Sequence, residues 1–172
     1  AGYAKGVIRY CVNQSSVSCN WDYVGGIAGQ ADGARIEYCA NYGEISGGED
    51  TERDGGIVGR AISNSVIFAC WNEGSVSSTG DDYIGGICGK QEDDAKVLCC
   101  VNLGSVQGRD YVGGIVGQGM CTFSFNAGQV RGSSHVGAVS GEASRLDWCR
   151  ALSWTSATLN GQSDNNGASW IS

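Results

Sequence analysis

The chain has 172 residues, among them 29 glycines, 9 cysteines, one histidine and no proline. Its 18 acidic and 11 basic residues give a net charge of −7, the opposite of what a binder of phosphate backbones needs. The single His135 removes most zinc and catalytic-triad chemistry, and no apolar run reaches the roughly 20 residues of a membrane-spanning helix.

From the N-terminus onward, two short motifs alternate along the chain without exception. One reads Asn-x-Gly-x-(Val/Ile) and begins at Asn13, Asn41, Asn72, Asn102 and Asn126, with Ser15 in place of glycine in the first copy. The other reads Gly-Gly-Ile-x-Gly and occupies residues 25–29, 55–59, 85–89 and 113–117, with a degenerate copy at 137–141. Copies recur every 24 to 31 residues, so the chain is an internal repeat.

Each repeat contains three short β-prone segments, which in the second repeat are residues 36–39, 44–46 and 55–58. Helices are disfavoured, because glycine costs about 1 kcal/mol at each helical position. A unit of this size cannot bury an apolar face alone, whereas stacked units can. The sequence therefore predicts an all-β parallel β-helix of five to six coils over residues 1–158, with an irregular polar tail or cap at 159–172.

In such a stack, equivalent residues of successive coils lie above one another, and each column forms a ladder. Three apolar columns are expected to make the core, and their members are Val17, Ile45, Val76, Val106 and Val130; Ile27, Ile57, Ile87, Ile115 and Val139; and Ile8, Ile36, Ile67, Val97, Cys121 and Leu146. The five motif asparagines predict a stacked amide ladder at a corner. The paired glycines are expected at bends with positive φ or in contact with a neighbouring coil.

The cysteines recur two positions before the motif asparagines, at Cys11, Cys39, Cys70 and Cys100, with Cys149 in the last copy. They are expected to be mostly reduced thiols that fill small core positions, because free cysteine behaves as a small hydrophobe. A metal string or a set of disulfides is the alternative. Cys19, Cys88 and Cys121 lie outside this column, which leaves isolated pairs open.

The alternation of Gly-Gly-Ile-x-Gly with Cys-x-Asn-x-Gly-x-Val over residues 8–155 resembles the GLUG-motif repeats. These repeats occur in non-catalytic regions of bacterial IgA-specific metallopeptidases and of other bacterial surface proteins. The resemblance implies a right-handed β-helix on an extracellular or cell-surface protein. It implies no peptidase, because the chain has no His-Glu-x-x-His motif.

Two other columns are candidate binding features. The residues two positions before each Gly-Gly are Tyr23, Arg53, Tyr83, Tyr111 and His135, and the three tyrosines are candidate sugar-facing aromatics. The alternative is a structural stack on the wall of the helix. Acidic clusters at 49–54, 81–82 and 92–94 are read as a solvated flank, with calcium binding between coils as the alternative.

Together these features predict a non-catalytic structural or adhesive module of an extracellular bacterial surface protein, with no cofactor, no metal, no nucleic acid and no membrane insertion. A host glycan or protein is the expected partner. Open strand edges at the coil ends predict contacts with neighbouring repeats or with other copies, so a head-to-tail filament is the first alternative. A carbohydrate-binding or carbohydrate-cleaving β-helix is the second.

Overall fold

A computed structural model describes residues 2–80, 83–153 and 168–171 of the chain. Within these residues the protein is a parallel β-solenoid of about five turns, as the repeat predicts. The described part contains no helix, and hence none that is long and apolar enough to cross a membrane.

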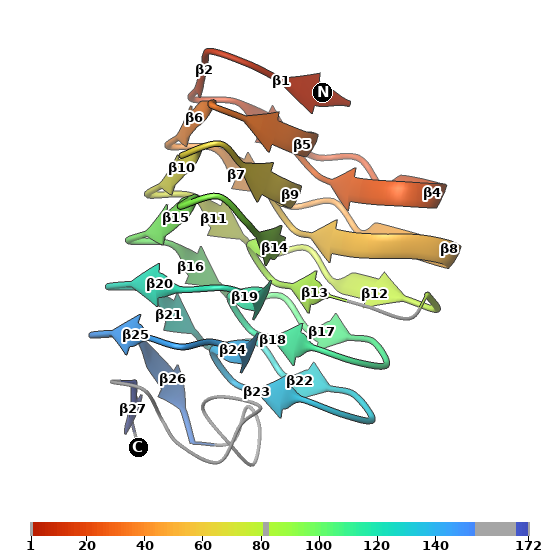
Figure 1. The fold of residues 1–172 in the computed structure, drawn as a ribbon. Coiled ribbons are helices and arrows are strands. Elements are labelled where there is room, and N and C mark those ends of the chain that lie inside the picture. Colours follow the sequence, from red (N-terminus) through yellow and green to blue (C-terminus); the bar gives the residue numbers. More distant parts are fainter. Residues whose placement is uncertain (1, 81–82, 154–167, 172) are drawn as a thin grey trace.

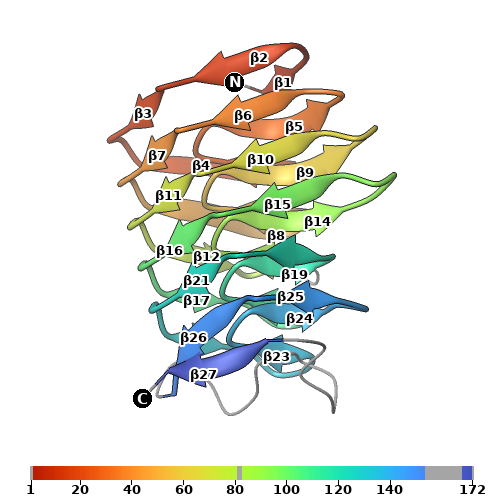
Figure 2. The ribbon, with the colours of Figure 1, turned by 90° about the vertical axis from the view of Figure 1, so that its left-hand side faces the viewer.

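Each coil contributes strands to four parallel sheets, which we name A to D in the order in which the chain visits them (Figures 1 and 2). Sheet A contains β1 (Tyr3–Ala4), β5 (Ala28–Asp32), β9 (Val58–Ile62), β14 (Cys88–Gln91), β19 (Val116–Gln118) and β24 (Ser140–Glu142). Sheet B contains β2 (Val7–Arg9), β6 (Arg35–Glu37), β10 (Val66–Phe68), β15 (Lys96–Leu98), β20 (Cys121–Thr122) and β25 (Leu146–Asp147). The expectation of three strands per repeat is therefore wrong.

The asparagine motif forms a sheet of its own. Sheet C contains β3 (Val12–Asn13), β7 (Ala40–Asn41), β11 (Trp71–Asn72), β16 (Val101–Asn102), β21 (Phe125–Asn126), β26 (Arg150–Leu152) and β27 (Ser169–Ile171). Each of the five asparagines is the last residue of its short strand, directly before the chain leaves sheet C, and the asparagines pair in register from coil to coil.

Sheet D differs between the two ends of the solenoid. Its first two coils carry the long strands β4 (Val17–Gly25) and β8 (Ile45–Gly55), which extend to the right in Figure 1. Later coils split this strand in two, giving β12 (Val76–Ser78), β13 (Ile84–Gly85), β17 (Val106–Gln107), β18 (Val112–Gly113), β22 (Val130–Arg131) and β23 (Val136–Gly137).

The three predicted apolar columns are confirmed. The column from Ile8 to Leu146 pairs in register through sheet B, and the column from Val17 to Val130 does so through sheet D. The column from Ile27 to Val139 is linked by backbone hydrogen bonds of 2.9–3.0 Å. The column that contains Ile36 and the column that contains Ile57 lie in the main core. The column of sheet D, which contains Ile45, belongs to a second, smaller core.

The expected tail at 159–172 lies mostly outside the described residues. Its described part is regular, since β27 adds a parallel rung to sheet C, with Trp170 opposite Ala151. At the other end, β1, β2 and β3 are the outermost described strands of sheets A, B and C.

Candidate functional site

The asparagine ladder is continuous through five coils. Each Nδ2 donates to the Oδ1 of the next asparagine at 2.7–2.8 Å, from Asn13 through to Asn126. The same Nδ2 also donates to the carbonyl two residues further on, at 2.7–2.9 Å. The amides of Asn41, Asn72, Asn102 and Asn126 are fully buried, so this ladder holds the coils together and offers no surface to a ligand.

The paired glycines have no positive φ and are explained by close packing. A Cβ on Gly56 would fall 2.4 Å from Cγ of Asn72 and 2.2 Å from the carbonyl oxygen of Gly86. The same relation holds between Gly86 and Asn102 and between Gly114 and Asn126. The second glycine of the Gly-Gly-Ile-x-Gly motif therefore packs against the asparagine of the Asn-x-Gly-x-(Val/Ile) motif.

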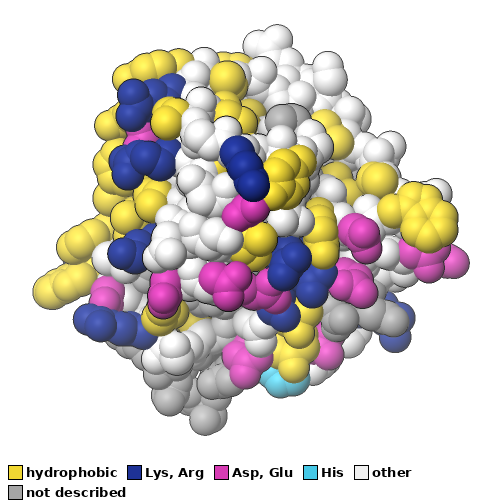
Figure 3. Space-filling model, turned by 45° about the horizontal axis from the view of Figure 1, so that its top comes forward, with side chains coloured by type: hydrophobic (Ala, Val, Ile, Leu, Met, Phe, Trp, Pro, Cys, Tyr) yellow, Lys and Arg dark blue, Asp and Glu magenta, His cyan; other side chains and the backbone are white. Residues whose placement is uncertain are grey.

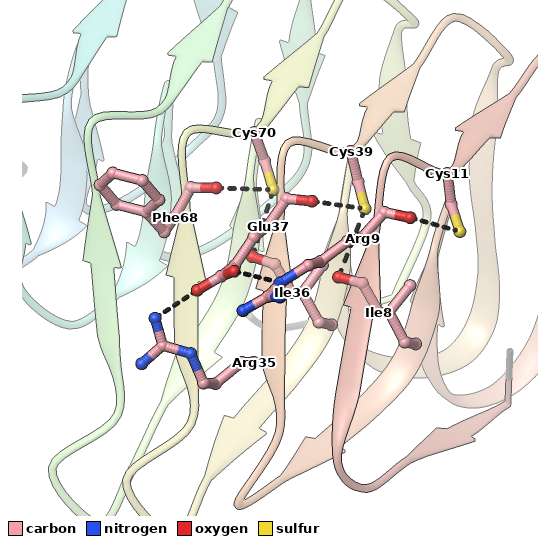
Figure 4. Close-up of polar contacts among 9 residues, drawn as sticks. All are labelled: Ile8, Arg9, Cys11, Arg35, Ile36, Glu37, Cys39, Phe68 and Cys70. Carbon is pink, nitrogen blue, oxygen red and sulfur yellow. Dashed lines mark hydrogen bonds and ion pairs between the residues drawn. The ribbon is translucent and has the colours of Figure 1, made fainter.

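The cysteine column lies where the chain turns from sheet B to sheet C, and in Figure 4 the thiols of Cys11, Cys39 and Cys70 point to backbone carbonyls. The Sγ of Cys70 lies 3.4 Å from the oxygen of Phe68 and 3.5 Å from that of Ile36. The neighbouring Cys100 thiol and burial raise the pKa of Cys70 to about 12. A thiol held protonated in this way is a poor nucleophile and metal ligand.

All nine cysteines are free thiols in the structure, and only Cys11, Cys19 and Cys99 are exposed. One contact between sulfurs stands out, because the Sγ atoms of the buried Cys121 and Cys149 lie 3.0 Å apart. Cys121 occupies a position that is isoleucine or valine in earlier coils, next to the corner thiols. Burial raises the pKa of Cys121, whereas its hydrogen bond lowers the pKa of Cys149.

The candidate sugar-facing tyrosines form a stack with their column neighbours. The ring of Tyr83 lies 4.9 Å from that of Tyr111, and Tyr111 lies 4.4 Å from His135. The guanidinium of Arg53 lies between Tyr23 and Tyr83, at 5.1 and 5.9 Å from their ring centres. Ring faces of this column are therefore covered by neighbouring rings and cations, which is the geometry of a structural stack.

The acidic side chains that the structure describes do not gather into a metal site. Among the described residues, no group of three or more His, Cys, Asp or Glu side chains is placed to hold a metal ion. Glu52 pairs with Arg53 at 2.6 Å, and Glu92 pairs with Arg60 and with Lys90. Asp81 and Asp82 lie outside the described residues.

One carboxyl is buried in the smaller core. Asp54 stands in a column with Val24 and Ile84, is fully buried, and leaves its Oδ1 without a hydrogen-bond partner. Burial raises its pKa to about 6, although Thr51 donates to Oδ2 at 3.1 Å. The expectation that Asp54 belongs to a solvated acidic flank is therefore wrong, because the coil register places this residue between Val24 and Ile84 in the smaller core.

Outward-facing side chains of sheet B form a surface that the motifs did not reveal. One column of this face alternates apolar and basic residues, and its members are Val7, Arg35, Val66, Lys96, Met120 and Arg145. The next column includes Arg9, Glu37, Phe68 and Leu98. At the adjoining corner, aromatic residues with left-handed backbone angles project outward, namely Tyr10, Tyr38, Phe123 and Trp148.

This face is hollowed along the solenoid axis. A groove of about 620 Å³ is lined by residues from Arg9 to Leu98, and a second of about 170 Å³ continues from Lys96 to Asp147. The two share Lys96 and Leu98, so we treat them as one feature and name it the sheet-B groove. Figure 3 shows Lys and Arg side chains beside hydrophobic ones on the left of the molecule, where sheet B lies in Figure 1.

Ion pairs hold the three arginines of the groove in place. Glu37 accepts from Nε of Arg9 at 2.6 Å and from Nη2 of Arg35, as Figure 4 shows. Burial works to raise the pKa of Glu37, but the two guanidinium groups outweigh it and lower the pKa. Asp147 accepts from Nε of Arg145 at 2.6 Å.

The fold and these surfaces define a parallel β-solenoid protein with a ligand-sized groove on one sheet. Comparison of the chain with protein-family models, with curated proteins and with solved structures finds no match.

Proposed function

We propose that the chain is a non-catalytic adhesive module of an extracellular bacterial surface protein. The observation that carries this proposal is the row of exposed aromatic side chains beside the sheet-B groove. Tyr10 and Trp148 are 73% and 68% exposed, and Tyr10 stacks on Tyr38 at 5.3 Å. Large apolar side chains kept in water along one face are typical of a binding surface.

The scaffold suits such a role. The buried amide ladder and two apolar cores run through successive coils, so the face is held on a rigid support. The resemblance of the repeat to GLUG motifs supports placement in a longer surface protein.

The charges of the groove support binding over cleavage. A glycosidase needs one carboxyl whose pKa is raised so that it donates a proton. The pKa of Glu37, the carboxyl that lines the larger groove, is lowered by Arg35 and Arg9. Asp54, whose pKa is raised, is buried in the core away from the surface.

The test is adhesion of the whole chain to an array of glycans and surface proteins, with Tyr38→Ala/Trp148→Ala beside the parent chain. We expect binding that the double variant weakens at least tenfold, while the far-ultraviolet circular dichroism is unchanged. Trp21, exposed on β4 away from the groove, gives the matched control Trp21→Ala. Turnover of any array glycan, or equal binding by the double variant, would contradict the proposal.

A head-to-tail filament is the second candidate, and it is favoured by the outer edges of β1, β2 and β3, with which no described strand pairs. At the opposite end, β24 and β25 have no further described partner strand. Parallel edges of this kind can pair with a second copy and, without closure, extend into a fibre. Negative-stain microscopy of the pure chain decides: unbranched fibres support this candidate, and a monomer at high concentration removes it.

A further inference from the structure

The sheet-B groove has a charge opposite to that of the whole protein. Its lining holds Arg9, Arg35, Lys96 and Arg145 against only Glu37 and Asp147, so it carries two net positive charges in a chain of net charge −7. Acidic side chains elsewhere repel a polyanion, and this groove is where one is attracted. Charge complementarity therefore points to an anionic ligand.

The cations also have a regular spacing. Arg35, Lys96 and Arg145 belong to one column and stand on alternate coils, with Val66 and Met120 on the coils between them. Because neighbouring parallel strands are about 4.8 Å apart, successive cations are separated by roughly 9.6 Å. This is close to the length of one extended disaccharide unit.

Each cation retains donors for a ligand. The pair with Glu37 involves Nη2 of Arg35, and the pair with Asp147 involves Nε of Arg145. A guanidinium has five N–H donors, so both arginines keep free ones and are oriented by their carboxylate partners. Lys96 is exposed, and among the described residues no carboxylate pairs with it.

The surface between the cations suits sugar rings. Half-buried Val66 and Phe68 and exposed Met120 offer apolar contact, and Tyr38 meets Phe68 edge to face at 5.6 Å. A nucleic-acid strand fits less well, because its phosphates recur about every 3.4 Å along a duplex axis. A neutral ligand would leave the exposed ammonium of Lys96 without a charged partner.

We propose that the sheet-B groove binds a linear acidic polysaccharide along the solenoid axis, with a carboxylate on every second sugar. The carboxylates meet Arg35, Lys96 and Arg145, and the sugars between them lie on Val66 and Met120. This inference rests on the proposed adhesive function and names the ligand class of the same surface.

The experiment measures binding of hyaluronan hexasaccharide, which has three carboxylates on alternate sugars, to the full chain by calorimetry. Lys96→Gln should weaken binding about tenfold, since a charge-assisted hydrogen bond is lost. Lys96→Arg should restore most of it. Lys5→Gln, at an exposed lysine that pairs with Asp32 outside the groove, is the matched control and should change affinity less than twofold.

A gain-of-specificity variant tests the spacing. Val66→Lys places a cation on the coil between Arg35 and Lys96. It should raise affinity for oligogalacturonate, which has a carboxylate on every sugar, about fivefold, while affinity for hyaluronan stays within twofold. Equal gains in affinity for both polymers would overturn the proposal that ligand carboxylates meet cations on alternate coils.

Other outcomes separate this inference from the adhesive function. Equal binding of the carboxyl-reduced hexasaccharide, tighter binding of poly-glutamate or single-stranded DNA, or no effect of Lys96→Gln would each overturn the acidic-glycan inference. Array binding that Tyr38→Ala/Trp148→Ala weakens would still support adhesion in those cases. Loss of both signals would contradict the adhesive function itself.

Discussion

Gly56 lies against the side chain of Asn72, so closely that a Cβ on this glycine would be 2.4 Å from the amide carbon. Glycine is needed here for space, since its φ lies outside the left-handed region. The contact joins the corner between sheets D and A to the strand of sheet C that carries the amide ladder. It explains why the two sequence motifs alternate without exception.

Replacement of Gly56 by alanine should destabilise the protein by about 2–3 kcal/mol, because a methyl group would overlap both Asn72 and the Gly86 carbonyl. Chemical denaturation measures the effect. Gly2→Ala is the control, since no atom lies within 4 Å of a Cβ placed there and its φ is not positive. Equal midpoints for the two variants would show that the corner yields to accommodate the methyl group.

Asn72→Ala should cost about 3 kcal/mol, because it removes one hydrogen bond each from buried polar groups of Asn41, Asn102 and Gly74. Asn13→Ala, at the partly exposed end of the same ladder, should cost about 1 kcal/mol or less. Thermal and urea unfolding provide the comparison. Equal losses of unfolding free energy in the two variants would contradict this expectation, because they would mean that buried and exposed asparagines stabilise the ladder equally.

Asp54 should make stability depend on pH in an unusual direction. Its pKa is about 6 in the folded protein, whereas an unfolded aspartate titrates near 4. Between these values the folded state holds the proton and the unfolded state does not, so stability falls as pH rises from about 4 to 6. The loss is about 3 kcal/mol, at about 1.4 kcal/mol per pH unit.

Asp54→Asn isolates this effect, because an amide imitates the protonated carboxyl at every pH. The difference in unfolding free energy between variant and parent should grow by about 3 kcal/mol from pH 4 to pH 6.5. Carboxylates whose pKa is lowered, such as Glu37 and Glu92, also contribute to the pH dependence of stability. Their contribution cancels in the difference, because both proteins contain them. Parallel stability curves would rule out titration of Asp54 in this range.

Thiol chemistry should follow burial. In the native protein the exposed Cys11, Cys19 and Cys99 should react quickly with Ellman's reagent and the six buried thiols slowly. All nine should react after denaturation without reductant. A smaller count in denaturant would reveal a disulfide that formed before the measurement.

Refolding with glutathione disulfide should join Cys121 to Cys149, whose sulfurs lie 3.0 Å apart. The protein loses two hydrogen atoms, and two glutathione thiols are released. A cross-link over this span should add about 3 kcal/mol of stability if it causes no strain. Mass spectrometry of the digest identifies the linked peptides, and Cys121→Val, which restores the residue type of this column, should abolish the link.

The sequence by itself determined the coil period, the three apolar columns and the amide ladder. Residues at equivalent places in a repeat must stack when the coils stack, so the motif spacing fixes their register. The fourth sheet was not predictable in this way, because two-residue strands such as β7 and β11 are stabilised by pairing between coils and show no alternation of their own.

Only the tertiary structure decided which faces are available to a ligand. The sequence marks Tyr83 and Tyr111 as candidate sugar-facing residues, yet their rings cover one another, because the spacing between coils is also a distance at which rings stack. The sheet-B groove belongs to no motif: Arg35, Lys96 and Arg145 come from different repeats and become one row only when alternate coils are superposed. Successive repeats alternate between a basic and an apolar residue at this position, and stacking of the coils turns that alternation into a regular distance between cations.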